Sequence, residues 1–453
     1  MLRSRKKLTM WSALPPYLGG KRRLCPIIFR EIDRIVPRRT WRHLTFLDAF
    51  HGGGSVSLFA KTQGLRVVAC DIAERAIIIG RALIENSRVK LTWEDVLRLL
   101  RPHDGPAGRV ETTMAPAVFT KDQARFLDSA LRVAGETPDP CKAALIRLLA
   151  MRVALLCHAY AQVRKGTIHR VSTGEFESIT ESAVYHYVDG MRLTTVGKLW
   201  DLAQQINAGI FEGQATILKQ SVLDALPSLS VSVAYFDPPY PGVLSYERQY
   251  ETIDEIFEGA SKPTSPFTAK DGANMIDGLF EKARHIPVWV LSLGNAVVGV
   301  EDLEAKMLRF GRRVKSIQLR YQHLPAVATE EKKGTNMEFV VIGVDEGLLD
   351  QTIGIDRHHA ASVVVENHRA LGTQDAAALA LAGDAGDERQ PDIPEQRLAG
   401  GPDDVVAVRS AGIDDPRPVV VENPLDGDGE GRQLGHEMTG SPAQMREVKE
   451  EMS

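Results

Sequence analysis

The segment VSVAYFDPPY, residues 231–240, ends an apolar run with an acid, two prolines and an aromatic ring. Pro238 and Pro239 remove two backbone donors and fix φ, so the turn is stiff and its carbonyls stay open as acceptors. The Asp237 carboxylate and the Pro238 carbonyl can each accept one N–H bond from an amino group, which leaves the nitrogen lone pair facing an electrophile. A planar base can stack on Tyr240. The alternative is an ordinary turn after a strand, which Asp and Pro also favour.

A second chemical signal is FLDAFHGGGSVSLFA, residues 46–60, where an expected strand ends at Asp48 and glycines precede an expected helix. Glycines permit positive φ and a close approach of ligand to backbone. A strand, a glycine turn and a helix in this order are typical of nucleotide-type sites. The GxGxxG spacing and the P-loop lysine are absent, which disfavours phosphate binding. A tight turn without a ligand is the alternative.

Two aspartates follow expected strands in this region. Asp71 can accept hydrogen bonds from both hydroxyls of a ribose, or it can cap the helix that follows. Asp48 can accept a hydrogen bond from an ammonium group, or it can simply end its strand.

The apolar runs predict a mainly parallel sheet with helices on its faces. The expected strands are Leu44–Asp48, Arg66–Asp71, Ser232–Phe236, Pro287–Leu291 and Glu338–Gly343, and the first two alternate with helices at about Leu24–Val36 and Ala73–Glu85. Residues 95–220 look helical instead, most clearly at Phe119–Val133 and Lys142–Ala161, so we expect them to form an inserted second domain.

Charge is distributed unevenly along the chain. Residues 345–453 hold 23 Asp/Glu and 9 Lys/Arg, and no aromatic residue follows Phe339. Such a segment buries too little apolar surface to offset its ordering entropy, so a disordered tail is expected. The rest of the chain is net positive, which suits a phosphate backbone but is also compatible with ordinary surface charge.

Four motifs together resemble those of the Dam-like (D12 class, alpha-ordered) DNA adenine-N6 methyltransferases, over about residues 11–345. They are PPYLGGKRRL (15–24), FLDAFHGGGS (46–55), VVACDI (67–72) and FDPPYPG (236–242). The resemblance implies an α/β fold with a Rossmann-like class I S-adenosylmethionine-dependent methyltransferase sheet and helices on both faces. It assigns residues 11–94 and 221–345 to that domain and residues 95–220 to an inserted, mainly helical target-recognition domain. Residues 346–453 remain as the disordered tail.

The resemblance also implies roles for single residues. Asp237, Pro238, Pro239 and Tyr240 would form the catalytic corner. The residues expected to bind S-adenosylmethionine are Tyr17, Lys21, Asp48, Phe50, Gly52, Gly54, Asp71, Asp224 and Asp237. Asp48 departs from the family's more usual Glu but keeps its charge.

The expected substrate is adenine in double-stranded DNA, flipped out of the helix, and the expected chemistry uses no metal. Phosphate contacts are expected from basic residues that could equally form ordinary solvated surface, namely Arg164, Lys165, His169, Arg170, Arg312, Arg313, Lys315, Lys332 and Lys333. Three alternatives stay open: an N6-adenine RNA enzyme, an N4-cytosine DNA enzyme, whose family more often has Ser in place of Asp237, and a non-catalytic nucleic-acid-binding relative.

Other classes of protein are disfavoured. No run of eighteen apolar residues and no secretory signal occurs, so we expect a cytoplasmic protein without a membrane partner. A restriction endonuclease of the same system is a possible partner that methyl transfer would not need. The four cysteines form no zinc spacing and are expected to be reduced thiols, mostly buried.

Overall fold

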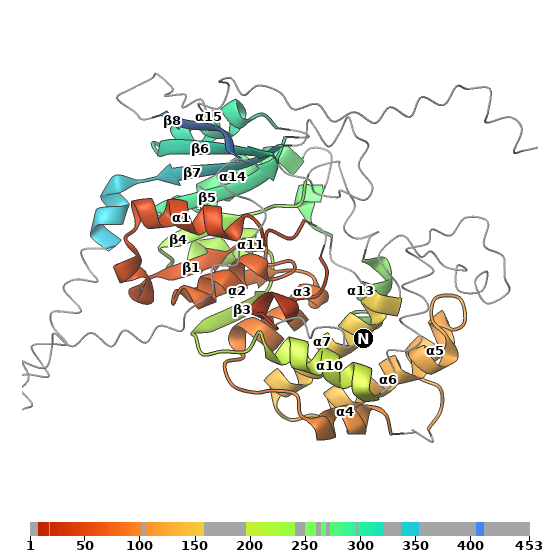
Figure 1. Cartoon of the computed structure of the whole chain (residues 1–453). Coiled ribbons are helices and arrows are strands. Elements are labelled where there is room, and N and C mark those ends of the chain that lie inside the picture. The colour runs from red at the N-terminus through yellow and green to blue at the C-terminus, as the bar shows by residue number, and fades with distance from the viewer. Residues whose placement is uncertain are drawn as a thin grey trace, which may run out of the picture. The chain divides into compact units, whose positions relative to one another are not determined.

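The sheet of the computed structural model has the strand order β3-β2-β1-β4-β5-β7-β6-β8 (Figure 1). The structure describes residues 8–17, 19–101, 105–157, 196–240, 250–259, 264–268, 272–295, 298–320, 337–352 and 405–411, which all belong to one compact unit, Met1–Val421. The strands are β1 (Thr45–Asp48), β2 (Arg66–Asp71), β3 (Ala215–Lys219), β4 (Val233–Phe236), β5 (Val288–Gly294), β6 (Arg313–Arg320), β7 (Met337–Val344) and β8 (Val405–Ala411).

Strands β1 to β5 run parallel, and β7 is antiparallel to both β5 and β6. Strands β2 and β3 follow β1 toward one edge of the sheet, and β5 follows β4 toward the other edge. The order therefore reverses between β1 and β4, which is where ligands bind in open α/β sheets.

The two faces of the sheet carry separate apolar cores, because successive side chains of a strand point to opposite faces. Phe46 and Val233 join the core that contains helices α1, α2 and α3. Their neighbours Leu47 and Ala234 join the core of α14 and α15 on the other face. The predicted arrangement of helices on both faces is confirmed.

The helices begin and end at conventional signals. Helix α1 has a proline in its first turn, and α4 and α6 begin with a threonine whose side chain accepts from the third residue of the helix. The helices are α1 (Cys25–Ile35), α2 (Ser55–Thr62), α3 (Glu74–Ile79), α4 (Trp93–Leu99), α5 (Arg109–Met114), α6 (Lys121–Gly135), α7 (Pro140–Cys157), α10 (Val196–Asn207), α11 (Val222–Ala225), α13 (Glu251–Phe257), α14 (Met275–Lys282) and α15 (Val300–Arg309). Shorter helical turns are η1 (Met10–Ser12), η2 (Arg38–His43), η3 (Gly80–Glu85), η5 (Leu226–Ser228), η6 (Pro266–Thr268) and η7 (Gly272–Asn274).

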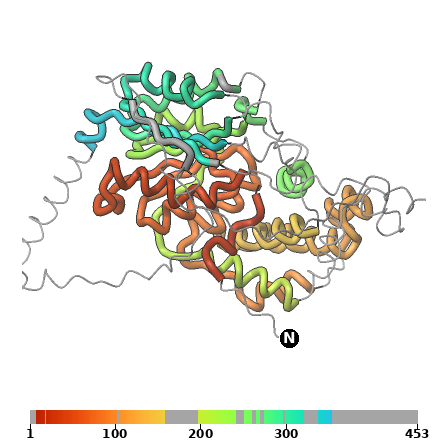
Figure 2. The backbone as a smooth tube through the Cα atoms, turned by 45° about the horizontal axis from the view of Figure 1, so that its top comes forward, coloured from red at the N-terminus to blue at the C-terminus, as the bar shows by residue number. Residues whose placement is uncertain are grey.

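The region predicted as an insertion is helical over most of its described part. Helices α4, α5, α6, α7 and α10 pack on one another, and α7 also packs on α3 and η3 of the sheet domain (Figure 2). Strand β3 is the exception. It lies within the predicted range 95–220 but pairs with β2, so residues 215–219 belong to the sheet domain.

The strands predicted from continuous apolar runs are confirmed as β1, β2, β4, β5 and β7. Three strands were not predicted. Strand β3 is only half-buried and its sequence ATILK carries a lysine, and β6 alternates charged and apolar residues. Strand β8 lies in the segment expected to be disordered and pairs with β6. The rest of that tail after Thr352 lies outside the described residues. The four cysteines are free, and Cys25, Cys70 and Cys157 are buried as expected.

One residue predicted to contact DNA phosphates has a structural role instead. The Arg312 side chain is 1% exposed, and its guanidinium donates to the carbonyls of Arg284, Ile286 and Pro287 at 2.7–2.8 Å. It also lies 3.8 Å from the centre of the Trp289 ring. Burial lowers the pKa of Arg312 to about 10, so it stays charged at neutral pH.

Of the other basic candidates, Lys315 pairs with Glu31 at 2.6 Å, and the exposed Arg313 pairs with Glu346 at 2.9 Å. Arg164, Lys165, His169, Arg170, Lys332 and Lys333 lie outside the described residues.

We expect Arg312→Ala to lower the free energy of unfolding by about 3 kcal/mol, because three buried carbonyls lose a charged donor. Urea unfolding measures this. Arg313→Ala is the control and should leave the midpoint near that of the wild type, since exposed ion pairs contribute little. A stable Arg312→Ala protein with weakened DNA affinity would contradict the structural role and would support the predicted phosphate contact instead.

Candidate active site

A cavity of about 220 Å³ lies at the carboxyl ends of β1, β2 and β4. Each of these strands leads into an aspartate that lines it: Asp48 ends β1, Asp71 ends β2, and Asp237 directly follows β4. The turn after β1 and the N-terminal segment around Tyr17 and Lys21 form further parts of the wall. Three carboxylates at one edge of the sheet favour a ligand that carries positive charge or several donors.

The turn between β1 and α2 can be built only with glycine at two positions. Gly52 has φ 48° and Gly54 has φ 76°, a region that residues with a Cβ rarely adopt. Gly53 is required for a different reason, because a Cβ there would lie 2.5 Å from the Cβ of Tyr17. The three glycines thus bring the backbone close to the Tyr17 side chain at the cavity wall.

Tyr17 is held by aromatic and polar neighbours on its other side. Its ring stacks on Tyr250 with centroids 4.8 Å apart, and Arg75 donates to its hydroxyl at 3.3 Å. Arg75 also pairs with both carboxylate oxygens of Asp254 in α13. Burial raises the pKa of Tyr17, so the phenol stays neutral. These contacts fix the position of one aromatic wall of the cavity.

The Asp48 side chain is 1% exposed and is held by Ser57. The backbone N–H and the hydroxyl of Ser57 donate to Asp48 Oδ2 at 3.1 and 2.6 Å. Because the Ser57 hydroxyl already donates its proton to Asp48, it can only accept from His51. His51 Nδ1 lies 2.9 Å from Ser57 Oγ, so Nδ1 is the ring nitrogen that carries the hydrogen. His51 Nε2 is then an acceptor.

Two acceptors of this group have no hydrogen-bond partner among the described residues: Asp48 Oδ1 and His51 Nε2. Both residues line the cavity. Burial raises the pKa of Asp48 to about 7, and burial lowers the pKa of His51 to about 4, so His51 is neutral. Buried acceptors without donors are costly, and a ligand with N–H groups would satisfy them.

Asp71 is not the N-cap of α3, which is Ala73, and instead holds the turn before that helix and the glycine turn. One carboxylate oxygen accepts from the Ala73 N–H at 2.9 Å and the other from the Gly52 N–H at 2.8 Å. Each oxygen keeps a further lone pair, so the carboxylate can still accept from hydroxyls of a ligand.

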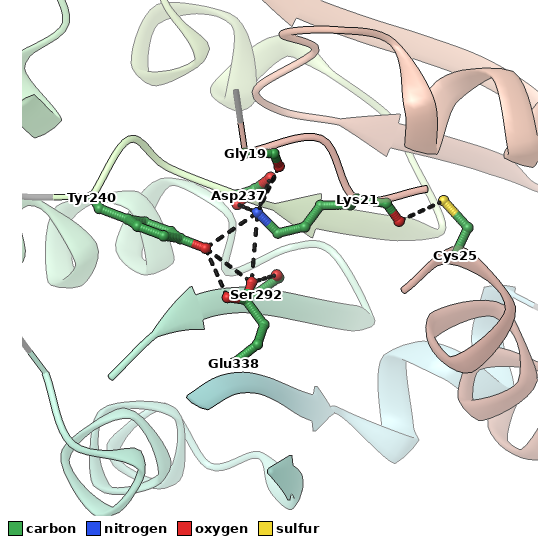
Figure 3. Close-up of polar contacts among 7 residues, drawn as sticks. All are labelled: Gly19, Lys21, Cys25, Asp237, Tyr240, Ser292 and Glu338. Atoms are coloured by element: carbon green, nitrogen blue, oxygen red, sulfur yellow. Dashed lines mark hydrogen bonds and ion pairs between the residues drawn. The ribbon is translucent and has the colours of Figure 1, made fainter. Parts of the chain in front are cut away.

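The Asp-Pro-Pro-Tyr corner is joined to the N-terminal segment by Lys21 (Figure 3). Lys21 Nζ lies 2.7 and 2.8 Å from the two carboxylate oxygens of Asp237 and 3.3 Å from the Tyr240 hydroxyl. The Lys21 side chain is only 3% exposed, against 18% for Asp237. Two hydrogen bonds from the buried lysine fix the orientation of the Asp237 carboxylate.

Two residues of this network were not predicted from the sequence. Glu338, on β7, accepts from the Tyr240 hydroxyl at 2.8 Å and from the Ser292 hydroxyl, on β5, at 2.6 Å. Lys21 Nζ lies 3.5 Å from the same carboxylate. The sequence did contain a signal for these two residues, because each is a polar residue inside an apolar strand. Glu338 stands in MEFVVIGV and Ser292 in VWVLSLG.

The remaining predicted residues fall into two groups. Phe50, Gly52 and Pro239 line the cavity. Three others are not among its lining residues: Gly54 is the N-cap of α2, Pro238 is buried, and Tyr240 is half-buried. Asp224 is exposed on α11 and is not among the residues that line the cavity. The wall at this place is formed by Gln220, Ser221 and Val222.

A mainly parallel sheet with a glycine turn at the reversal of strand order, and an Asp-Pro-Pro-Tyr corner on the adjacent strand, define a Rossmann-like class I methyltransferase. Residues 17–262 match the D12 class N6 adenine-specific DNA methyltransferases, and the chain belongs to this family. It is 24% identical over 341 residues to the type II methyltransferase M2.HphI of Haemophilus parahaemolyticus, covering 72% of this chain and 96% of that protein. The chain is therefore a DNA methyltransferase.

Two other kinds of feature are absent from the part of the chain that the structure describes. No group of three or more His, Cys, Asp or Glu side chains is arranged to hold a metal ion there. Nor does any helix among those described combine the length and apolarity needed to cross a membrane.

We expect Gly53→Ala to lower the free energy of unfolding by about 1–3 kcal/mol, because the new methyl group must displace Tyr17 from its stack on Tyr250. Thermal unfolding and the near-ultraviolet circular dichroism of the tyrosines measure the change. Gly278→Ala, in α14 with nothing within 4 Å of the added Cβ, is the control and should be neutral or stabilising. Equal effects of both substitutions would contradict the close contact at Gly53.

Proposed function

We propose that the chain transfers the methyl group of S-adenosylmethionine to the exocyclic N6 amine of adenine in double-stranded DNA. One observation carries the proposal: Asp237 and Pro239 line the same cavity as Tyr17, Phe50 and Gly52. An amine held at Asp237 therefore lies beside a ligand held on the glycine turn. Membership of an N6 adenine-specific family supports the same base and atom.

The polar groups of the cavity suit this cofactor. Asp48 Oδ1 and His51 Nε2 would accept from its ammonium group, and the free lone pairs of Asp71 would accept from its ribose hydroxyls. Tyr17 and Phe50 would pack against its apolar parts. When bound, S-adenosylmethionine supplies an electrophilic methyl carbon on a sulfonium group.

The side chains of the protein position the other reactant. A stacked adenine cannot reach the cavity, so the base must leave the duplex, at a cost of a few kcal/mol. Asp237 and the Pro238 carbonyl would accept the two N6 hydrogens, and the Tyr240 ring would stack on the base, which contributes about 1–3 kcal/mol. Lys21 holds the Asp237 carboxylate in place through two hydrogen bonds, and each oxygen keeps a lone pair for the amine. The proton lost from N6 passes to solvent.

We assign target recognition to the helical insertion, residues 95–220 without β3. Its described helices pack together and contact the sheet through α7, which supports a helical subdomain for this role. Residues 158–195 of this range lie outside the described residues.

The relative M2.HphI is named a type II methyltransferase, and we extend membership of a restriction–modification system to this chain as a proposal. A restriction endonuclease with the same target sequence would be its partner. Methyl transfer itself would not need that partner.

Expression in a host that lacks adenine methylation should place N6-methyladenine in one sequence context of its DNA. Asp237→Ala should lower the modified fraction at least about a hundredfold, because the amine loses the acceptor that orients it. Modification mapping at nucleotide resolution measures both. Asp350→Ala, exposed after β7, is the control and should match the wild type. Methylation of cytosine N4, of RNA alone, or of nothing would contradict the proposed reaction.

Cofactor binding should release a proton from Asp48 below pH 7. Its pKa in the folded protein is about 7 against an ordinary 3.8, so a cationic ligand beside it favours the ionised form. Affinity should therefore rise from about pH 5.5 to 7.5, by up to tenfold per pH unit. The same raised pKa makes the contribution of Asp48 to folding stability fall as pH rises from about 4 to 7. His51 stays neutral throughout, with its pKa of about 4.

Calorimetric titration with S-adenosylmethionine at pH 6, in two buffers of different ionisation enthalpy, counts the protons released. Asp48→Asn should abolish the release and flatten the pH dependence. Proton release that persists in Asp48→Asn would assign it to another group.

A further inference from the structure

Glu338 is a buried carboxylate that the proposed reaction does not yet use. It is 0% exposed and lies on β7, where it pairs with Gly294 of β5. Ser292 is on the same strand as Gly294. The last register pair between β4 and β5 joins Phe236 to Leu291, and Asp237 is the residue after Phe236. Asp237, directly after β4, Ser292 on β5 and Glu338 on β7 thus follow one another across three adjacent strands, and Asp237 lines the cavity.

The hydrogen bonds around Glu338 have a defined direction. Lys21 donates to the Tyr240 hydroxyl oxygen at 3.3 Å, and the Tyr240 hydroxyl donates to Glu338 at 2.8 Å (Figure 3). Ser292 donates to the other Glu338 oxygen at 2.6 Å. The Tyr240 hydroxyl is therefore held both as acceptor and as donor, which fixes the position of the far end of the ring.

The charges of this cluster explain why a carboxylate can be buried there. A carboxylate without partners in the interior would cost several kcal/mol, and pairing with hydrogen bonds offsets the cost. Glu338 has two hydroxyl donors and lies 3.5 Å from Lys21 Nζ. Lys21 in turn contacts Asp237 at 2.7 Å, so its ammonium lies between two carboxylates.

We propose that Glu338 is a positioning residue for methyl transfer, which fixes the Tyr240 ring for stacking of the target base and holds Lys21 against Asp237. This inference rests on the proposed function of the Asp-Pro-Pro-Tyr corner. Without the Glu338 carboxylate, the Tyr240 hydroxyl loses this acceptor, and the far end of the ring is less restrained against swinging about the Cα–Cβ bond. The base would then be captured in several orientations, and few of them would align N6 for transfer.

The first test measures the contact without any reaction. The protein is labelled with 3-fluorotyrosine, and the ¹⁹F resonance of Tyr240 is assigned by its absence in Tyr240→Phe. Glu338→Gln should shift or broaden that resonance. The matched control is Glu304→Gln, which alters a Ser–Glu hydrogen bond between α15 and β6, outside the cavity, and should leave the resonance in place. An unchanged Tyr240 resonance in Glu338→Gln would overturn the proposal.

The second test measures the consequence for transfer to DNA. Glu338→Gln should lower kcat roughly tenfold to a hundredfold, with KM for S-adenosylmethionine within about twofold of the wild type. Because Glu338 acts largely through the Tyr240 hydroxyl, Glu338→Gln combined with Tyr240→Phe should lose less than the product of the two single losses. Independent, multiplying losses, or a normal kcat in Glu338→Gln, would overturn the positioning role.

The two tests separate the two proposals. A wild-type protein that methylates no DNA but shows the shifted Tyr240 resonance in Glu338→Gln contradicts the proposed reaction and leaves the contact standing. An active wild type whose Glu338→Gln variant is unchanged in both measurements contradicts only the inference about Glu338.

Discussion

The buried ion pair between Lys21 and Asp237 is the contact on which the site depends. Lys21 precedes α1 near the N-terminus, and Asp237 follows β4, so the pair closes a separation of 216 residues. The ammonium of Lys21, at 3% exposure, needs an anionic partner, and Asp237 at 2.7 Å is nearer to it than Glu338 at 3.5 Å. The pair thus fixes the corner that would receive the target amine, and it places the Tyr17 segment over the glycine turn.

The order of the strands determines which groups meet at the cavity. Because β1 and β4 are neighbours and β2 lies on the other side of β1, the aspartates at their carboxyl ends converge although they are distant in the chain. Because β7 is antiparallel to β5, Glu338 near the start of β7 lies beside Gly294 at the end of β5. The result is an edge rich in carboxylates with one buried lysine, which is complementary to a cationic methyl donor and to an amine.

The sequence predicted the parts of the fold that local patterns determine. Continuous apolar runs identified β1, β2, β4, β5 and β7, and the glycine and Asp-Pro-Pro-Tyr motifs identified residues that do line one cavity. It did not predict β3, whose pairing with β2 becomes visible only in the sheet. Nor did it predict that Arg312 stacks on Trp289, or that Glu338 contacts Tyr240, because these partners are distant in the chain. Asp224 was assigned by a motif, and the structure places it at the surface.

The central claim is that one cavity holds a methyl donor and an adenine amine together. Incubation of the purified protein with duplex DNA and S-adenosylmethionine carrying a trideuterated methyl group tests it most directly. Mass spectrometry of the released nucleosides should find the intact trideuterated methyl group on N6 of deoxyadenosine. Label on deoxycytidine, or no label on DNA that contains every short sequence context, would contradict the account.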